Sequence, residues 1–120
     1  MIVVYLAGPF RGHNAYEVYR NVQMAEAVMH EVILRGQAHN VNLAVLCPHS
    51  MSAHFDKTFT DQYWIDATLE LLRRCDRVLM LRGWEKSVGA LGEKAEAERR
   101  SIPVYTTLDD LMIAILESLR

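Results

Sequence analysis

Residues 75–93 of the chain read CDRVLMLRGWEKSVGALGE, which combines a short apolar run with a turn and the start of a helical pattern. The run from Val78 to Leu81 predicts a buried strand, and the helical pattern begins around Ala90. Glu93 is then expected in the first turn of that helix, just beyond the carboxyl end of the strand. Open α/β sheets bind their ligands at this edge, so the stretch predicts both a fold class and the place of a site.

The rest of the chain continues the alternation of strand and helix. Its other predicted strands are Ile2–Leu6, Val41–Cys47 and Pro103–Tyr105, and its helices run from Asn14 to Gly36, from Asp61 to Arg74, from Ala90 to Arg100 and onward from Thr107. Asn14 is expected to cap the first helix, and Gly36 to end it in a left-handed conformation. Residues 49–60 are polar and irregular and predict a long loop over a site. Because the strands are apolar on both faces, we expect one three-layer α/β domain over residues 1–120, with a doubly wound parallel sheet between helices.

Composition and charge narrow the function classes. The 120 residues are 51% hydrophobic and 23% charged, which is typical of one globular domain. A net charge of −2 argues against a nucleic-acid or anionic-membrane surface, and no apolar run is long enough to span a bilayer. Met1 to Leu6 is interpreted as a strand rather than a signal peptide, because no basic region precedes it. Cys47 and Cys75 lack a CxxC spacing and indicate free thiols in a reducing, cytoplasmic compartment.

The loop after the first strand reads GPFRG, residues 8–12. It matches neither GxGxxG nor a P-loop, which ends in Gly-Lys-Ser/Thr. Its two glycines still allow the backbone to approach an anion closely, and Arg11 can bind a phosphate with two parallel hydrogen bonds. The alternative is an ordinary loop with a solvated arginine. Tyr5, in the preceding strand, is either a packing residue or a group whose hydroxyl orients a carboxylate.

Glu93 likewise has two interpretations. A carboxylate in the first turn of a helix can simply stabilise the helix dipole, which is common. Alternatively, Ser87 and the N–H groups after Gly89 form an anion-binding nest, and Glu93 faces the same pocket. A carboxylate placed there could do chemistry on a sugar.

A metal site and a stacking site are the remaining candidates. Cys47, His49 and His54 match no standard zinc spacing and no fourth ligand is obvious, so we expect no metal. His49 then either contacts a substrate or is solvated in its loop. Trp64 and Trp84 either stack on a nucleobase or fill the core or a subunit contact.

Six short motifs lie within residues 1–13 and 61–105: Tyr5-Leu-Ala-Gly8, Arg11-Gly12, Cys75-Asp76, Gly83-Trp84-Glu85, Ser87-x-Gly89-x-x-x-Glu93 and Ile102-Pro103-Val104. Together they resemble the nucleoside 2-deoxyribosyltransferase superfamily, and within it most of all the short DUF4406-type proteins. The 2'-deoxynucleoside 5'-phosphate N-hydrolases are a similar branch. The Ser-x-Gly-x-x-x-Glu turn is the more specific part of the resemblance, and the Tyr-x-x-Gly strand is the weaker part.

The resemblance implies a flavodoxin-like (Rossmann-like) fold and cleavage of an N-glycosidic bond without a cofactor. Glu93 matches the nucleophile, which attacks the anomeric carbon of a 2'-deoxynucleoside 5'-monophosphate or related nucleoside and forms a covalent glycosyl intermediate. Tyr5 matches the tyrosine that positions this carboxylate. Water or a second base then resolves the intermediate, giving a hydrolase or a transferase. The residues expected to bind the substrate, several of them at its 5'-phosphate, are Gly8, Phe10, Arg11, Gly12, His49, Trp84, Ser87 and Gly89.

Two features depart from the superfamily. The acid that assists departure of the base would lie at Thr68, which is not a carboxylate. Asp66 is two residues away, about 200° around a helix, so it does not simply inherit the role. Asp61 and His49 are the other candidates for the proton donor. The N-hydrolases also take a serine from a neighbouring subunit, out of a segment after the last strand, but here Tyr105 runs almost directly into the final helix and we expect that serine to be absent.

Two further functions remain open on the sequence alone. The missing acid is compatible with a non-catalytic module that binds or senses a nucleotide in the same pocket. A flavodoxin-type redox or dinucleotide protein ranks last, because the phosphate-loop pattern and an acidic ribose ligand are absent. The expected partners are a small-molecule nucleotide or nucleoside and further copies of the chain in a homo-oligomer, with no nucleic acid and no membrane.

Overall fold

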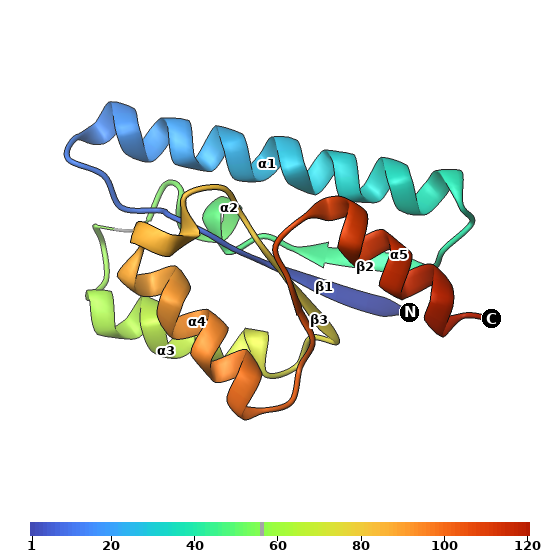
Figure 1. Ribbon diagram of the computed structural model, residues 1–120. Coiled ribbons are helices and arrows are strands. Elements are labelled where there is room, and N and C mark those ends of the chain that lie inside the picture. Colours follow the sequence, from blue (N-terminus) through green and yellow to red (C-terminus); the bar gives the residue numbers. More distant parts are fainter. Residues whose placement is uncertain (56) are drawn as a thin grey trace.

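The protein forms an α/β fold built on a four-stranded sheet (Figure 1). The computed structural model describes residues 1–55 and 57–120. Asp56, which falls in the loop predicted over residues 49–60, lies outside the described residues. The elements in chain order are β1 (Ile2–Ala7), α1 (Ala15–Ala38), β2 (Leu43–Leu46), α2 (Pro48–Ser52), α3 (Asp61–Leu72), β3 (Arg77–Met80), the 3₁₀ helix η1 (Trp84–Lys86), α4 (Val88–Arg99), β4 (Val104–Tyr105) and α5 (Leu108–Ser118).

The sheet is parallel, with the strand order β2-β1-β3-β4. The central strand β1 pairs with both β2 and β3, so Tyr5 lies opposite Leu46 on one side and Val78 on the other. The chain thus moves from β1 to one side of the sheet and then crosses to the other side. This confirms the predicted doubly wound, flavodoxin-like arrangement, whose crevice lies between β1 and β3.

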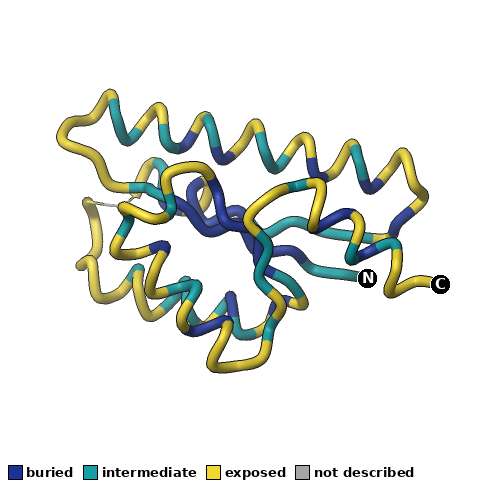
Figure 2. Tube along the Cα trace, in the orientation of Figure 1, coloured by how far each residue is buried: buried dark blue, intermediate teal, exposed yellow. Residues whose placement is uncertain are grey.

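Helices cover both faces of the sheet, with α1 and α5 on one face and α3 and α4 on the other (Figure 1). Successive side chains of β1 point to opposite faces, as they do in any strand. Val4 and Leu6 pack with residues of α1 and α5, whereas Tyr5 and Ala7 pack with Leu72 at the end of α3. These β1 side chains are fully buried, and Figure 2 shows the buried segments concentrated along the strands. Tyr5 is therefore directed into the layer that contains α3 and α4.

The first helix begins as predicted but ends differently. Asn14 caps α1, because its side chain accepts a hydrogen bond of 2.9 Å from the backbone N–H of Glu17. The left-handed cap expected at Gly36 is wrong, since α1 continues to Ala38 and Gly36 has no positive φ. A Cβ atom at Gly36 would lie 2.6 Å from Cδ2 of Leu43. The glycine is therefore needed for the close packing of α1 against β2, not for a turn.

The loop predicted over residues 49–60 is wrong at its start, where a short helix forms instead. Pro48 occupies the first turn of α2, a position at which proline's missing N–H costs nothing. Ser50 then donates a hydrogen bond of 2.6 Å to the carboxylate of Glu26 on α1. This contact joins α2 to α1, and His49 of α2 is buried.

A buried carboxylate joins α3 to α4. Glu96 of α4 is buried, and its side chain forms ion pairs with Arg99 and Arg100 on its own helix and, at 2.5 Å, with Arg73 at the end of α3. The hydrogen bonds from Arg99 and Arg73 lower the pKa of Glu96 to about 2. A buried carboxylate needs such partners, because an unpaired charge in this position would be costly. The network holds the relative position of the two helices that line the site described below.

The two thiols agree with the sequence-based expectation. Cys47 and Cys75 are buried and unpaired. Burial raises the pKa of the Cys75 thiol to about 11, so this cysteine stays protonated at neutral pH. In residues 1–55 and 57–120, no helix combines the length and the apolar character required to cross a membrane.

Candidate active site

A cleft of about 690 Å³ opens at the carboxyl edge of the sheet. Its walls come from the segments that follow β1, β2 and β3, together with α3 and α4, and this volume is typical of small-ligand sites. The position next to β1 and β3 is where the doubly wound fold predicts a crevice. The lining residues are Gly8, Pro9, Phe10, Arg11, Pro48, His49, Ser52, Asp61, Trp64, Ile65, Thr68, Leu69, Gly83, Lys86, Ser87, Val88, Gly89, Gly92 and Glu93.

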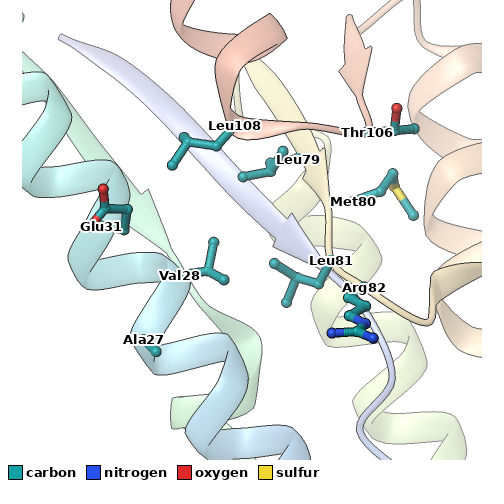
Figure 3. A pocket seen from close by; sticks show the side chains of 9 residues that line it. All are labelled: Ala27, Val28, Glu31, Leu79, Met80, Leu81, Arg82, Thr106 and Leu108. Atoms are coloured by element: carbon teal, nitrogen blue, oxygen red, sulfur yellow. The ribbon is translucent and has the colours of Figure 1, made fainter.

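A second hollow, of about 280 Å³, lies on the other side of the sheet between α1 and the segment that leads into α5 (Figure 3). Its wall is mainly apolar and includes Leu79, Leu81 and Leu108. Glu31 and Arg82 are the charged residues in its lining. This smaller hollow brings together no nucleophile with an activating partner, and the chemistry of the fold is therefore sought in the larger cleft.

Glu93 lies in the second turn of α4, not in the first turn as predicted. The difference arises because Ser87 caps the helix: its Oγ accepts a hydrogen bond of 3.1 Å from the N–H of Ala90, so α4 begins at Val88. Interaction with the helix dipole falls off within the first turn. Stabilisation of the dipole therefore explains little about the carboxylate of Glu93.

Tyr5 is the immediate partner of Glu93. The hydroxyl of this fully buried tyrosine donates a hydrogen bond to Oε2 of Glu93, which lines the cleft. Burial raises the pKa of Glu93 to about 7, and the hydrogen bond from Tyr5 opposes that rise. Burial, followed by the nearby charge of Glu93, raises the pKa of Tyr5 well above its ordinary value. At neutral pH the tyrosine is therefore a neutral donor, while Glu93 exchanges readily between its protonated and ionised forms.

Among the described residues, two cations and one exposed carboxylate lie at the lining of the cleft. Arg11 and Lys86 both line it, and the N–H groups of Val88 and Gly89 begin α4, where helix geometry gives them no intrahelical acceptor. Arg11 forms an ion pair with Asp61 across the cleft, but their side chains are 52% and 77% exposed. Such exposed pairs contribute little free energy, so an incoming anion can compete for Arg11.

Lys86 was missed by the sequence reasoning. A signal for it was present, since it directly precedes the Ser-x-Gly turn in residues 87–89.

His49 is buried in the wall of the cleft, not solvated in a loop as one interpretation held. Its side chain donates a hydrogen bond from Nε2 to the carbonyl oxygen of Pro9 at 3.0 Å, and its ring meets Phe10 edge-on. Its Nδ1 is buried and has no hydrogen-bond partner among the described residues. Burial lowers the pKa of His49, so its ring is neutral at pH 7, and the N–H proton on Nε2 is engaged in the hydrogen bond to the carbonyl oxygen of Pro9. His49 is therefore a poor proton donor and serves to hold the loop after β1.

The structure also places the other proton-donor candidates. Asp66, the doubtful candidate for a catalytic role, is exposed, accepts a hydrogen bond of 2.7 Å from Gln62 and does not line the cleft, so the structure does not bring it into the candidate site. The reason is its helical position, which turns it away from the face that Thr68 presents. Thr68 does line the cleft, and its hydroxyl donates to the carbonyl oxygen of Trp64 at 2.8 Å. Asp61 lines the cleft but is engaged by Arg11.

The comparison with known proteins adds a family. The model for a family described as "Domain of unknown function (DUF4406)" matches residues 2–106. The chain belongs to the DUF4406 family. No curated protein and no solved structure matches it.

Of the expected substrate-binding residues, two are absent from the lining of the cleft in this DUF4406 protein. A Cβ atom at Gly12 would lie 2.5 Å from Cβ of Glu17, so this glycine permits the tight entry into α1. Trp84 packs against the core cluster that contains Tyr5, and Nζ of Lys94 lies 5.7 Å from its ring centroid. The remaining expected residues, namely Gly8, Phe10, Arg11, His49, Ser87 and Gly89, do line the cleft.

Trp64 is the tryptophan that borders the cleft. It belongs to an aromatic group with Phe59 and Tyr63, in which its ring centroid lies 5.1 Å from that of Tyr63. In the described part of this DUF4406 protein, no group of three or more His, Cys, Asp or Glu side chains could hold a metal ion.

Proposed function

We propose that this DUF4406 protein cleaves the N-glycosidic bond of a 2'-deoxynucleoside 5'-monophosphate or a related nucleoside. The observation that carries the proposal is the hydrogen bond from the buried Tyr5 to Glu93, which lines the large cleft. A carboxylate positioned by a buried phenol suits nucleophilic attack on a sugar. The resemblance to the nucleoside 2-deoxyribosyltransferase superfamily supports the same role for both residues.

The proposed reaction has two displacements at the anomeric carbon. In the first, an oxygen of ionised Glu93 bonds to the carbon, and the carbon–nitrogen bond breaks with its electron pair leaving on the base, which takes up a proton from solvent. In the second, a water oxygen attacks the same carbon, loses a proton to solvent and releases the Glu93 carboxylate. Transfer to another base replaces water by a ring nitrogen of that base. The hydrogen bond from Tyr5 holds the carboxylate in place through both steps.

The mouth of the cleft supports a nucleotide over a nucleoside. Arg11 and Lys86 are cations, and the N–H groups at the start of α4 add the partial positive charge of a helix N-terminus. These groups together suit a 5'-phosphate. We expect Lys86→Ala to raise the KM for a 2'-deoxynucleoside 5'-monophosphate while leaving the KM for the matching nucleoside nearly unchanged.

A non-catalytic nucleotide-binding module is the second candidate, and a specific observation favours it. The cleft carries Thr68 where a proton donor is expected, His49 is neutral with its proton held by Pro9, and Asp61 is paired with Arg11. A base that departs without a dedicated acid leaves more slowly. The module would then hold a nucleotide without releasing its base.

The experiment that tests the proposal is incubation with each of the four 2'-deoxynucleoside 5'-monophosphates, with free base measured by chromatography. Glu93→Gln should abolish base release, whereas Glu98→Gln, on the exposed side of the same helix, should retain it. Release at the wild-type rate by Glu93→Gln contradicts the proposed mechanism. Nucleotide-dependent rises in Tm without any base release favour the binding module.

We also propose a homo-oligomer, on the strength of the resemblance. Phe59 and Tyr63 are 54% and 51% exposed on the α3 side of the cleft, and exposed aromatic side chains are common at subunit interfaces. Light scattering of the purified protein tests this directly. A monomer at all concentrations contradicts it.

A further inference from the structure

The helix that carries Glu93 contains two glycines that packing does not require. Glycine inside a helix costs about 1 kcal/mol relative to alanine, so its presence there needs a reason. At Gly36, inside α1, the reason is contact, because a Cβ atom would lie 2.6 Å from Cδ2 of Leu43. At Gly92 a Cβ atom would meet nothing within 4 Å, and at Gly89 it would meet Oγ of Ser87 at 4.0 Å.

Both of these glycines line the large cleft, and neither has a positive φ. Both glycines are exposed, so a side chain at either position would extend into open space at the lining of the cleft. Gly92 directly precedes Glu93, so its open side borders the region in which the anomeric carbon must lie. A residue that lowers the stability of a helix without improving its packing is typical of a functional position.

The wall of the cleft contributed by α3 contains an apolar and aromatic part beside the polar Asp61 and Thr68. This part includes Trp64, Ile65 and Leu69, and α3 lies beside α4 on the same face of the sheet (Figure 1). A flat nucleobase fits between an apolar wall and a bare stretch of helix backbone, because both can contact its ring faces. A side chain at position 92 would narrow that space.

We infer that Gly92 determines how large a base the cleft accepts, and that its missing side chain admits a purine. The inference rests on the proposed function and adds the specificity of that site. A side chain at position 92 should therefore lower the affinity and the turnover of purine nucleotides. It should lower those of pyrimidine nucleotides less, because a pyrimidine has only one ring. The protein itself gains stability from the same substitution, since the new Cβ atom meets no protein atom.

The test measures stability and ligand preference in Gly92→Ala and Gly92→Leu. Without ligand, Gly92→Ala should raise the Tm by about 4 °C, the shift expected for removing one helix glycine from a domain of this size. Gly36→Ala, a matched substitution on α1, should lower the Tm because of its contact with Leu43. A fall in Tm for Gly92→Ala would show that packing requires the glycine and would overturn the inference.

Ligand preference is measured by thermal shift with the four 2'-deoxynucleoside 5'-monophosphates and by base release. Gly92→Leu should reduce the purine signal at least 10-fold more than the pyrimidine signal. Leu91→Ala, a neighbouring substitution outside the cleft lining, should leave the ratio unchanged. An unchanged purine-to-pyrimidine ratio in Gly92→Leu overturns the inference.

The two readouts separate this inference from the proposed function. If nucleotides raise the Tm but no base is released, glycosidic cleavage fails while the thermal shifts still decide the role of Gly92. If base is released with an unchanged ratio in Gly92→Leu, cleavage stands and the inference fails. If the wild-type protein neither binds nor cleaves any of the four nucleotides, both are refuted.

Discussion

Replacing Tyr5 by phenylalanine removes the hydroxyl that donates to Glu93 and keeps the ring that fills the core. The nucleophilic role that we propose for Glu93 requires its ionised form, so under this proposal its pKa sets the pH at which the reaction begins. In the wild-type protein burial raises this pKa to about 7, and the hydrogen bond from Tyr5 holds it below the value that burial alone would produce. Tyr5→Phe is therefore expected to move the pH dependence of base release upward.

The magnitude follows from the energy of the lost hydrogen bond. A hydrogen bond to a charged group stabilises it by about 1.5–3 kcal/mol, and 1.36 kcal/mol corresponds to one pKa unit, so the pKa of Glu93 rises by roughly 1 to 2. At pH 7 about half of the wild-type carboxylate is ionised, against roughly one tenth to one hundredth in the variant. The value of kcat/KM at pH 7 should therefore fall roughly 5- to 50-fold. Much of the loss should be recovered above pH 9, where the variant's carboxylate is ionised again.

The assay is base release from the preferred nucleotide between pH 5 and pH 10, with spontaneous release subtracted. In the wild-type protein kcat/KM should rise with pH and level off above the pKa of Glu93. Tyr19→Phe, an exposed tyrosine of α1 outside the cleft lining, is the matched control and should give the wild-type profile. An equal loss of activity at every pH in Tyr5→Phe contradicts this prediction, because the hydroxyl would then have no influence on the ionisation of Glu93.

Three further predictions concern stability, each measured by urea unfolding. Gly36→Ala should lower the free energy of unfolding by about 1–3 kcal/mol, because its Cβ atom would lie 2.6 Å from Leu43 and that overlap outweighs the better helix propensity; a variant as stable as the wild type contradicts this. Glu93 has a folded-state pKa of about 7 against an ordinary value of 4.5, so the wild-type protein should lose stability as pH rises between these values. Glu93→Gln should not show this loss and should be more stable than the wild type by about 2–3 kcal/mol at pH 8, whereas identical pH dependences would argue against a buried, ionisable Glu93. Glu96 has a pKa lowered from 4.5 to about 2, so its ionised carboxylate stabilises the folded protein above pH 4.5, and this stabilisation is lost as the pH falls toward 2. Glu96→Gln should therefore be less stable than the wild type at pH 7 and should lose less stability on acidification. Parallel plots of stability against pH for the two proteins would contradict this prediction.

Several parts of the fold could be predicted because their causes are local. The strands follow from short apolar runs, and the helix start at Asn14 follows from a side chain that accepts a hydrogen bond from an N–H three residues later. The edge that carries the cleft follows from parallel pairing, which brings the ends of β1, β2 and β3 together. The short helix α2 was missed because its polar sequence has no apolar period, although Pro48 is a good first residue for a helix.

The candidate site was predicted in part. The sequence and the resemblance single out Tyr5 and Glu93, but their hydrogen bond joins residues 88 positions apart and depends on how α4 packs against β1. The position of Glu93 in its helix was misjudged by a turn, because the capping role of Ser87 was not recognised. Lys86 was overlooked because the signal for it, its place just before the Ser-x-Gly turn, does not distinguish a binding lysine from a solvated one.

The sequence by itself determined the alternation of strand and helix, the parallel sheet and the edge at which the cleft opens, because the pattern that predicts them lies in residues close together in the chain. The tertiary structure decided what individual residues do. Both Gly36 and Gly92 lie in helices, but only Gly36 is required by packing. The side chain of Leu43 lies beside Gly36, whereas the space beside Gly92 is open. His49 is neutral and buried, and Glu93 has a pKa near 7, because burial and hydrogen-bond partners come from distant segments. Such properties arise only from distances between atoms that folding brings together.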